Sequence, residues 1–266
     1  MVNNMIGVFD SGVGGLTVVR EIFKKLPDYK IVYFGDTART PYGTKSKETI
    51  IKYAREDAKF LLDHGAKIIV IACNTASAVA AEILRKELNV PVFEVIMPAV
   101  QAALSVTKRG NVGVIGTRAT ITSGVYELMI KNSNKNIQVE SQPCPLLVPL
   151  VEEAWLNQPE TKKIVKKYLQ PFKNKQIDTL ILGCTHYPVL KNIIKARVGR
   201  KVKLVDSAEE VVHELKKFLA KNDSVEKSLI KDGDHKFFVS DLTAQVPKIA
   251  EKLLGKTVKF EKVEVG

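Results

Sequence analysis

Two cysteines stand at points where an apolar segment gives way to polar residues. Cys73 follows the apolar run 68–72 and Cys184 follows the run 179–183, and each precedes side chains that hydrogen-bond ligands, namely Asn74 and Thr75 in the first case and Thr185 and His186 in the second. One cysteine in such a place is usually a packing residue. Two cysteines in matching settings favour a catalytic role, because a thiol with a pKa of ~8.5 can donate or accept a proton near neutral pH.

His186 lies two residues after Cys184, where an imidazole could lower the pKa of that thiol. Cys73, Cys184 and His186 could alternatively supply a zinc site of two cysteines and one histidine. The C-x-H spacing is unusual for zinc ligands and neither cysteine has a C-x-x-C partner, so we expect no metal. Cys144 lies between two prolines, lacks this setting and is expected to be structural.

Asp10 ends the first apolar run and opens the glycine-rich segment Ser11-Gly12-Val13-Gly14-Gly15. A dinucleotide fingerprint would need a third glycine where Thr17 stands, and no lysine follows as in a phosphate loop. Glycines allow close backbone approach, and a helix that starts after them offers free N–H groups. Backbone donors beside one carboxylate suit a zwitterion such as an amino acid.

Three further residues are weaker candidates, each with an ordinary structural explanation. Asp36 ends the second apolar run and is followed by Pro41-Tyr42-Gly43, which is also typical of a turn. Thr117 could hydrogen-bond a carboxylate or simply cap a helix. Glu152 follows an apolar segment, 148–151, and would by default lie on a solvated helix face.

The elements that must position these residues alternate along the whole chain. The predicted strands cover residues 6–9, 31–34, 67–72, 92–95, 112–115, 137–140, 179–182, 202–205, 237–239 and 258–263. Amphipathic helical segments between them include 46–64, 76–88, 160–169 and 208–219. Apolar runs without alternation suit strands that are covered on both faces, and strand–helix alternation favours parallel sheets flanked by helices. The predicted fold class is α/β.

The two halves of the chain also resemble each other weakly. Gly7 and Cys73 are 66 residues apart, and Gly113 and Cys184 are 71 apart. We therefore predict two similar domains, 1–97 plus 208–266 on the Cys73 side and 98–207 on the Cys184 side. The segment after residue 208 has no counterpart in the second unit and is expected to fold back onto the first.

The chain has 266 residues, of which 45% are apolar. This length fits one large or two small domains, and the apolar content excludes a mostly disordered or collagen-like chain. No apolar stretch reaches the ~18–20 residues of a membrane span. The N-terminal residues lack a signal-peptide pattern, so we expect a cytoplasmic protein without membrane association. Three cysteines, an odd number, do not make a disulfide framework.

The balance of 41 Lys and Arg against 29 Asp and Glu gives a formal net charge of +12. A basic nucleic-acid-binding protein is therefore an alternative of a different class. Aromatic residues are only 7% of the chain, and no basic helix or known nucleic-acid motif is present. A lysine-rich solvated surface is the favoured interpretation, and a nucleic-acid partner is not expected.

Five motifs occur together in one order. They are Phe9-Asp10-Ser11-Gly12-Val13-Gly14-Gly15-Leu16-Thr17, Gly35-Asp36 with Pro41-Tyr42-Gly43, Ala72-Cys73-Asn74-Thr75-Ala76, Pro149-Leu150-Val151-Glu152-Glu153 and Gly183-Cys184-Thr185-His186-Tyr187-Pro188. In this order and spacing the sequence resembles the glutamate racemases, within the cofactor-independent aspartate/glutamate racemase superfamily. The resemblance runs from residue 6 to about residue 207 and weakens beyond it.

The resemblance implies two α/β domains that face each other across a cleft, with one cysteine on each wall. It implies an enzyme that interconverts L- and D-glutamate, without cofactor or metal, and supplies D-glutamate for the peptidoglycan of the bacterial cell wall. Cys73 and Cys184 would be the acid/base thiols, assisted by Asp10 and His186, with Asp36 and Glu152 less certain. Substrate contacts would come from Asp10, Ser11, Tyr42, Gly43, Asn74, Thr75, Thr117, Thr185 and His186.

The chemistry agrees with this resemblance. Inverting Cα means removing a proton from one face and delivering one to the other, which two groups on opposite walls can do without crossing the substrate plane. Neutral donors such as Asn74, Thr75 and Thr185 could stabilise carbanion charge in a closed cleft. An aspartate racemase of the same superfamily is the close alternative, because pocket depth decides between the two substrates. The sequence is also compatible with a homodimer.

Overall fold

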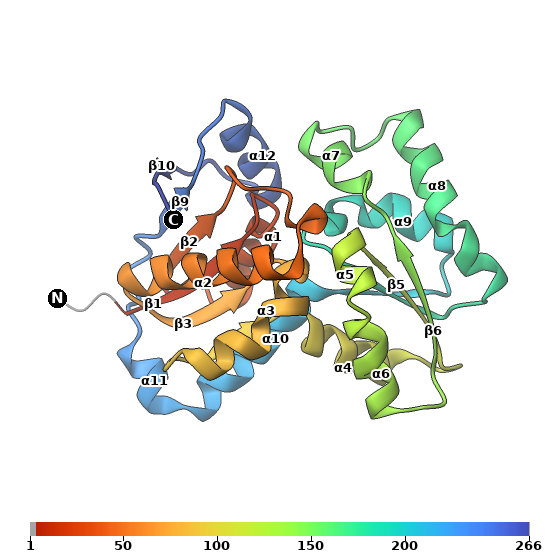
Figure 1. Ribbon diagram of the computed structural model, residues 1–266, viewed down its shortest axis with the longest axis horizontal. Helices are drawn as coiled ribbons and strands as arrows, with labels where there is room; N and C mark the ends of the chain where they lie inside the picture. The colour runs from red at the N-terminus through yellow and green to blue at the C-terminus, as the bar shows by residue number, and fades with distance from the viewer. Residues whose placement is uncertain (1–3, 266) are drawn as a thin grey trace.

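The computed structural model describes residues 4–265, which form two parallel sheets lying beside each other (Figure 1). The six-stranded first sheet has the order β10 (Glu261–Lys262), β9 (Lys236–Val239), β2 (Ile31–Gly35), β1 (Met5–Asp10), β3 (Ala66–Ile71), β4 (Val92–Glu94). The four-stranded second sheet has the order β6 (Gln138–Pro143), β5 (Asn111–Gly116), β7 (Thr179–Gly183), β8 (Lys203–Asp206). The predicted α/β class is confirmed.

Helices cover both faces of each sheet. On the first sheet, one face is covered by α1 (Leu16–Lys25), α10 (Ser207–Lys221) and α12 (Gln245–Leu254), and the other by α2 (Lys47–Asp63) and α3 (Asn74–Glu87). On the second sheet, α4 (Ile96–Val106) and α6 (Val125–Ser133) lie opposite α8 (Pro159–Asn174) and α9 (Lys191–Val198). The shorter elements are η1 (Tyr42–Thr44), α5 (Arg118–Thr122), α7 (Leu147–Glu152), η2 (Tyr187–Leu190) and α11 (Asp223–Ser228).

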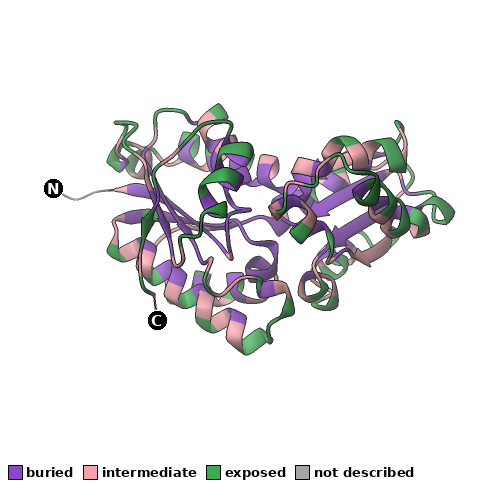
Figure 2. Ribbon diagram, turned by 90° about the horizontal axis from the view of Figure 1, so that it is seen from above, coloured by how far each residue is buried: buried purple, intermediate pink, exposed green. Residues whose placement is uncertain are grey.

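Burial on both faces explains the unbroken apolar runs of the sequence. Successive side chains of a strand point to opposite faces, so Ile6 and Val8 of β1 pack into one core while Met5 and Phe9 pack into another. Figure 2 shows the central strands of both sheets buried, while the helices keep exposed outer faces. Central strands of this kind are stiffly held, which makes their carboxyl ends good supports for reactive side chains.

The chain after α10 returns to the first sheet. There β9 pairs in parallel with β2, with Phe34 opposite Phe238, and α12 packs against α1. The strand predicted over 258–263 is confined to Glu261–Lys262, since its pairing with β9 spans only two residues. No helix within residues 4–265 has both the length and the apolar composition needed to cross a membrane.

Candidate active site

The carboxyl ends of strands from both sheets meet at one closed cavity of ≈ 30 Å³. Two cysteines line this cavity, Cys73 after β3 and Cys184 after β7. Each of the two residues is only 5% exposed. The cavity is lined by Ser11, Thr40, Pro41, Tyr42, Gly43, Cys73, Asn74, Thr75, Thr117, Val148, Cys184, Thr185 and His186. The structure thus brings the two thiols together although 111 positions separate them in the chain (184 − 73 = 111).

Cys73 lies at the start of α3 in a setting that keeps its proton. Its sulfur accepts a hydrogen bond from the backbone N–H of Ala76 at 3.5 Å, and the thiol faces the Ser11 hydroxyl at 3.5 Å. Burial, and after it the negative charge of Asp10, raise the pKa of the Cys73 thiol to about 12. At neutral pH this group is therefore a thiol that can donate a proton.

Cys184 has a cationic neighbour instead. Its sulfur lies 3.8 Å from Nδ1 of His186, whose Nε2 lies 3.2 Å from Oε1 of Glu152. Burial lowers the pKa of His186, but interactions with the Cys184 sulfur and with Glu152 outweigh it and raise that pKa to about 10. An imidazolium at this place stabilises negative charge on the sulfur. The two thiols therefore lie in electrostatically opposite surroundings.

Asp10 lies beneath the cavity and does not line it. Its buried carboxylate accepts hydrogen bonds from the Gly12 N–H at 3.1 Å and from the Thr185 hydroxyl at 3.3 Å. Burial raises the pKa of Asp10, and the charge of His186 with these hydrogen bonds offsets only part of that rise. Because Asp10 is the last residue of β1 and Thr185 lies just after β7, this contact joins the two sheets.

Glycine is required where the first loop touches the second sheet. A Cβ atom on Gly14 would lie 2.4 Å from the Thr185 hydroxyl and 2.5 Å from Cε1 of His186. A Cβ on Gly43 would similarly lie 2.8 Å from Cβ of Thr117. All three distances are far shorter than ordinary non-bonded contacts. These two glycines let the walls of the cavity close.

Neutral hydroxyl and amide groups complete the lining. The hydroxyl of Thr75 lies 2.9 Å from that of Thr117 and 3.2 Å from that of Thr120. The side-chain oxygen of Asn74 accepts a hydrogen bond of 2.7 Å from the Tyr126 hydroxyl. Thr120 and Tyr126, both buried, were not candidates from sequence. The one sequence feature that could have indicated Thr120 is its position three residues after Thr117, which caps α5.

The weaker sequence candidates lie at different distances from the cavity. Asp36 is fully buried outside it, and the Tyr42 hydroxyl bonds to Asp36 and Asp57, so this hydroxyl is already engaged away from the cavity. Glu152 lines an adjoining hollow of ≈ 340 Å³ and reaches the site through His186. Thr40 and Val148 line both spaces, and nothing in their residue types would have singled them out.

The zinc alternative finds no support in this arrangement. Within residues 4–265, no three His, Cys, Asp or Glu side chains are grouped so that they could hold a metal ion. Cys73 and Cys184 form no disulfide bond, and His186 contacts Cys184 through Nδ1 and Glu152 through Nε2. These residue types are suited to proton transfer.

The structure has two α/β domains and a thiol on each wall of a polar cavity. The family model for Asp/Glu/Hydantoin racemases matches residues 6–215, and the chain belongs to this family. It is 47% identical over 250 residues to a glutamate racemase of Geobacter metallireducens, covering 94% of this chain and 92% of that protein.

Solved structures agree with this assignment. A glutamate racemase isoform from Bacillus anthracis superposes with a TM-score of 0.92 at 40% identity, covering 99% of this chain and 98% of that one. A Francisella tularensis glutamate racemase in complex with D-glutamate gives a TM-score of 0.91 at 41% identity, with the same coverage. The resemblance seen in the sequence motifs is confirmed, and the chain is an amino-acid racemase.

Proposed function

We propose that the protein interconverts L- and D-glutamate by proton transfer between two thiols, and that it supplies D-glutamate for peptidoglycan. The observation that carries this proposal is that Cys73 and Cys184 reach one closed cavity from two different sheets. The relatives support glutamate as the substrate, because the similar proteins described above are glutamate racemases, one of them solved with D-glutamate.

The surroundings of the two thiols give each a role in one direction of the reaction. The Cys184 thiolate, beside the His186 imidazolium, removes the proton from Cα, so that the C–H bond breaks and an S–H bond forms. The Cys73 thiol then delivers its own proton to the opposite face of Cα. The net change is inversion without oxidation or reduction. In the reverse direction the roles are exchanged: the Cys73 thiolate removes the proton and the Cys184 thiol delivers one.

The other cavity residues hold the substrate and its developing charge. The neutral donors Asn74, Thr75, Thr117 and Thr185 bond the carboxylates, whose charge rises when Cα loses its proton. Asp10 favours the ammonium group from beneath the cavity, where it accepts a hydrogen bond from the lining residue Thr185. A low-dielectric cavity strengthens each of these interactions. Excluding water also protects the carbanion from solvent protons.

The cavity of ≈ 30 Å³ accommodates about one water molecule and not a glutamate. The walls must therefore separate when substrate binds, and the Thr75–Thr117 contact between them must open. We propose that the domains divide at residues 97/98 and 207/208, as the sequence predicts, and that these two chain crossings act as hinges. Residues at such crossings absorb backbone rotation in many enzymes.

The test is circular dichroism of L-glutamate incubated with the purified protein, after dialysis against EDTA and without added cofactor. The proposal predicts that the signal decays to zero as the racemic mixture forms, while L-aspartate incubated in parallel keeps its signal. Decay with L-aspartate alone would instead assign the aspartate alternative. Activity that disappears on dialysis and returns with Zn²⁺ would overturn the metal-free mechanism.

A further inference from the structure

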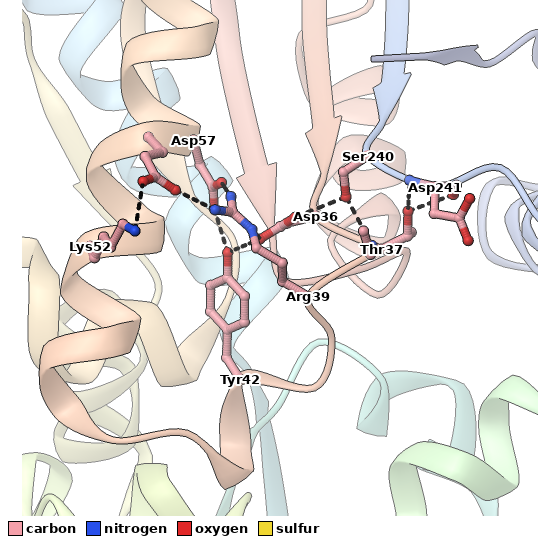
Figure 3. Close-up of polar contacts among 10 residues, drawn as sticks. Asp36, Thr37, Arg39, Tyr42, Lys52, Asp57, Ser240 and Asp241 are labelled. Atoms are coloured by element: carbon pink, nitrogen blue, oxygen red, sulfur yellow. Dashed lines mark hydrogen bonds and ion pairs between the residues drawn. The ribbon is translucent and has the colours of Figure 1, made fainter. Parts of the chain in front are cut away.

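A buried polar cluster lies behind the loop that follows β2, on the side of Tyr42 away from the cavity (Figure 3). The Tyr42 hydroxyl contacts Oδ2 of Asp36 and also Oδ2 of Asp57, the latter at 2.8 Å. Arg39 bridges the same carboxyls, with Nε 2.6 Å from Asp36 and Nη2 3.0 Å from Oδ1 of Asp57. Tyr42, Asp36 and Asp57 are fully buried. The proposed reaction makes no use of Asp57.

The hydrogen bonds of this cluster determine how many of its oxygen atoms must carry a proton. Two hydrogen bonds join three oxygen atoms, those of Asp36, Tyr42 and Asp57, and the phenol supplies one proton. Burial and the two neighbouring carboxyls raise the pKa of Tyr42, so the phenol does keep that proton. The second hydrogen bond therefore needs a proton on one of the carboxyl groups.

The donors around each carboxyl identify which one is protonated. Asp36 accepts from Arg39 Nε and, at 2.8 Å, from the Ser240 hydroxyl, in addition to Tyr42, as an ionised carboxylate does. Asp57 accepts from Arg39 through Oδ1 only, and its Oδ2 contacts the phenol oxygen. Burial and the charge of Asp36 raise the pKa of Asp57 well above its ordinary value, against the hydrogen bond of Tyr42 and the charge of Arg39.

The cluster is coupled to the cavity through the loop 40–43. Tyr42 begins the short helix η1, and its neighbours Thr40, Pro41 and Gly43 line the cavity with it. Gly43 packs so closely on Thr117 of the other wall that a Cβ atom would not fit. A shift of the Tyr42 ring would therefore move the loop that closes over the substrate.

We propose that Asp57 is a positioning residue for this substrate-binding loop: it keeps its proton in the folded protein and donates it to the Tyr42 hydroxyl, while Tyr42 donates to Asp36. The chain of hydrogen bonds Asp57–Tyr42–Asp36 fixes the loop in its closed place. This inference rests on the proposed function, because the loop matters through its contact with glutamate.

The charged groups around Asp57 define what happens when it loses the proton. They are Asp36, Arg39, Tyr42 and Glu56, with Lys52 paired to Glu56 at 3.8 Å and the Tyr53 ring 4.1 Å beneath the Arg39 guanidinium. Arg39 is shared among Asp36, Glu56 and Asp57, so an ionised Asp57 puts a third carboxylate on one guanidinium and leaves the phenol with one proton for two anions. The loop then loosens, and KM for glutamate rises at alkaline pH.

The test compares Asp57→Asn with Asp57→Ala. Asparagine reproduces the neutral acid, since its oxygen can accept from Arg39 and its NH₂ group can donate to Tyr42. We expect KM of the Asn variant to stay within about twofold of the wild-type value at neutral pH. Unlike the wild-type KM, it should not rise at alkaline pH. The Ala variant should raise KM about tenfold with a smaller change in kcat, the size expected for one buried hydrogen bond. Asp63→Asn, at an exposed position of the same helix, is the matched control.

An Asn variant as impaired as the Ala variant would show that an ionised carboxylate is needed and would overturn the proposal, as would an Ala variant with unchanged KM. Infrared spectroscopy gives a readout that does not depend on activity or on the folding of the Ala variant. Wild type at neutral pH should show a protonated-carboxyl carbonyl band that Asp57→Asn lacks. Racemase activity without that band would overturn the assignment of the proton, whereas the band without racemase activity would overturn the proposed function.

Discussion

The hydroxyl group of Thr17, in α1, lies 3.1 Å from the carbonyl oxygen of Thr185, the residue between the second thiol and its imidazole. The same hydroxyl bonds the Gly14 carbonyl at 2.9 Å, and Thr17 is fully buried. A helix of the first domain thus holds the reactive loop of the second. Closure of the cavity rests on such direct contacts between the walls.

Replacing Thr17 by valine removes this donor and keeps the side-chain shape. We expect the free energy of unfolding to fall by about 1–3 kcal/mol, because the buried Thr185 carbonyl loses its donor, while the Gly14 carbonyl keeps the backbone N–H of Thr17. Activity should fall as well, since the Thr185–His186 loop is less firmly placed. Urea denaturation and initial rates measure the two effects. The exposed Thr122 of α5 provides the control, and a Thr17→Val protein indistinguishable from Thr122→Val would contradict the role given to this contact.

Removing either reactive thiol should abolish racemisation without unfolding the protein. Each turnover uses both thiols, and a general acid or base typically contributes ~10²–10⁴-fold. Cys73→Ala and Cys184→Ala should therefore each lose at least that factor in kcat. Cys144 is equally buried but lies outside the cavity, so Cys144→Ala is the matched control and should remain active. A folded Cys73 or Cys184 variant with most of its activity would refute the two-thiol assignment.

His186 should make stability depend on pH in a defined window. Its pKa is about 10 in the folded protein, because hydrogen bonds with Cys184 and Glu152 outweigh burial, and ~6.5 when unfolded. A raised folded pKa means that the folded state binds the proton more tightly. The stabilisation is therefore complete below about pH 6.5 and is lost as pH rises through about 10.

Urea denaturation of wild type and His186→Gln between about pH 6 and about pH 10.5 measures this contribution. The advantage of wild type should shrink steadily with rising pH. Glu152→Gln, which weakens the support of the imidazolium, should move the loss to lower pH. A difference between wild type and His186→Gln that stays constant over the range would show that the imidazole is not protonated in the folded protein.

Much of this site was predictable because parallel strands end at the same edge of a sheet. Cys73, Thr117 and Cys184 each follow an apolar run, so the position of each in the sequence already places it at that edge. The strands themselves are recognisable because burial on both faces leaves them continuously apolar. The roles of these residues in the reaction still rest on the proposals above.

The supporting residues were not predictable in the same way. Asp57 looks like any polar residue of an amphipathic helix, and only the packing of α2 on β2 turns it toward Tyr42. Ser240 bonds Asp36 across 204 positions, which no local pattern can indicate. Asp36 follows its strand as a catalytic carboxylate would, yet loop geometry directs it away from the cavity. Side-chain direction in a loop depends on contacts that are distant in the sequence.

The central claim is that two thiols act on opposite faces of Cα, and the isotope content of the first product tests it. Racemisation of L-glutamate in D₂O is stopped below about a tenth of conversion, and mass spectrometry reads deuterium in each separated enantiomer. The account predicts D-glutamate that carries deuterium at Cα in nearly every molecule, delivered by the thiol on the opposite wall, while the remaining L-glutamate stays largely unlabelled. D-glutamate that mostly retains the original hydrogen would show that one base carries the proton across, and would contradict the account even if both cysteines proved essential.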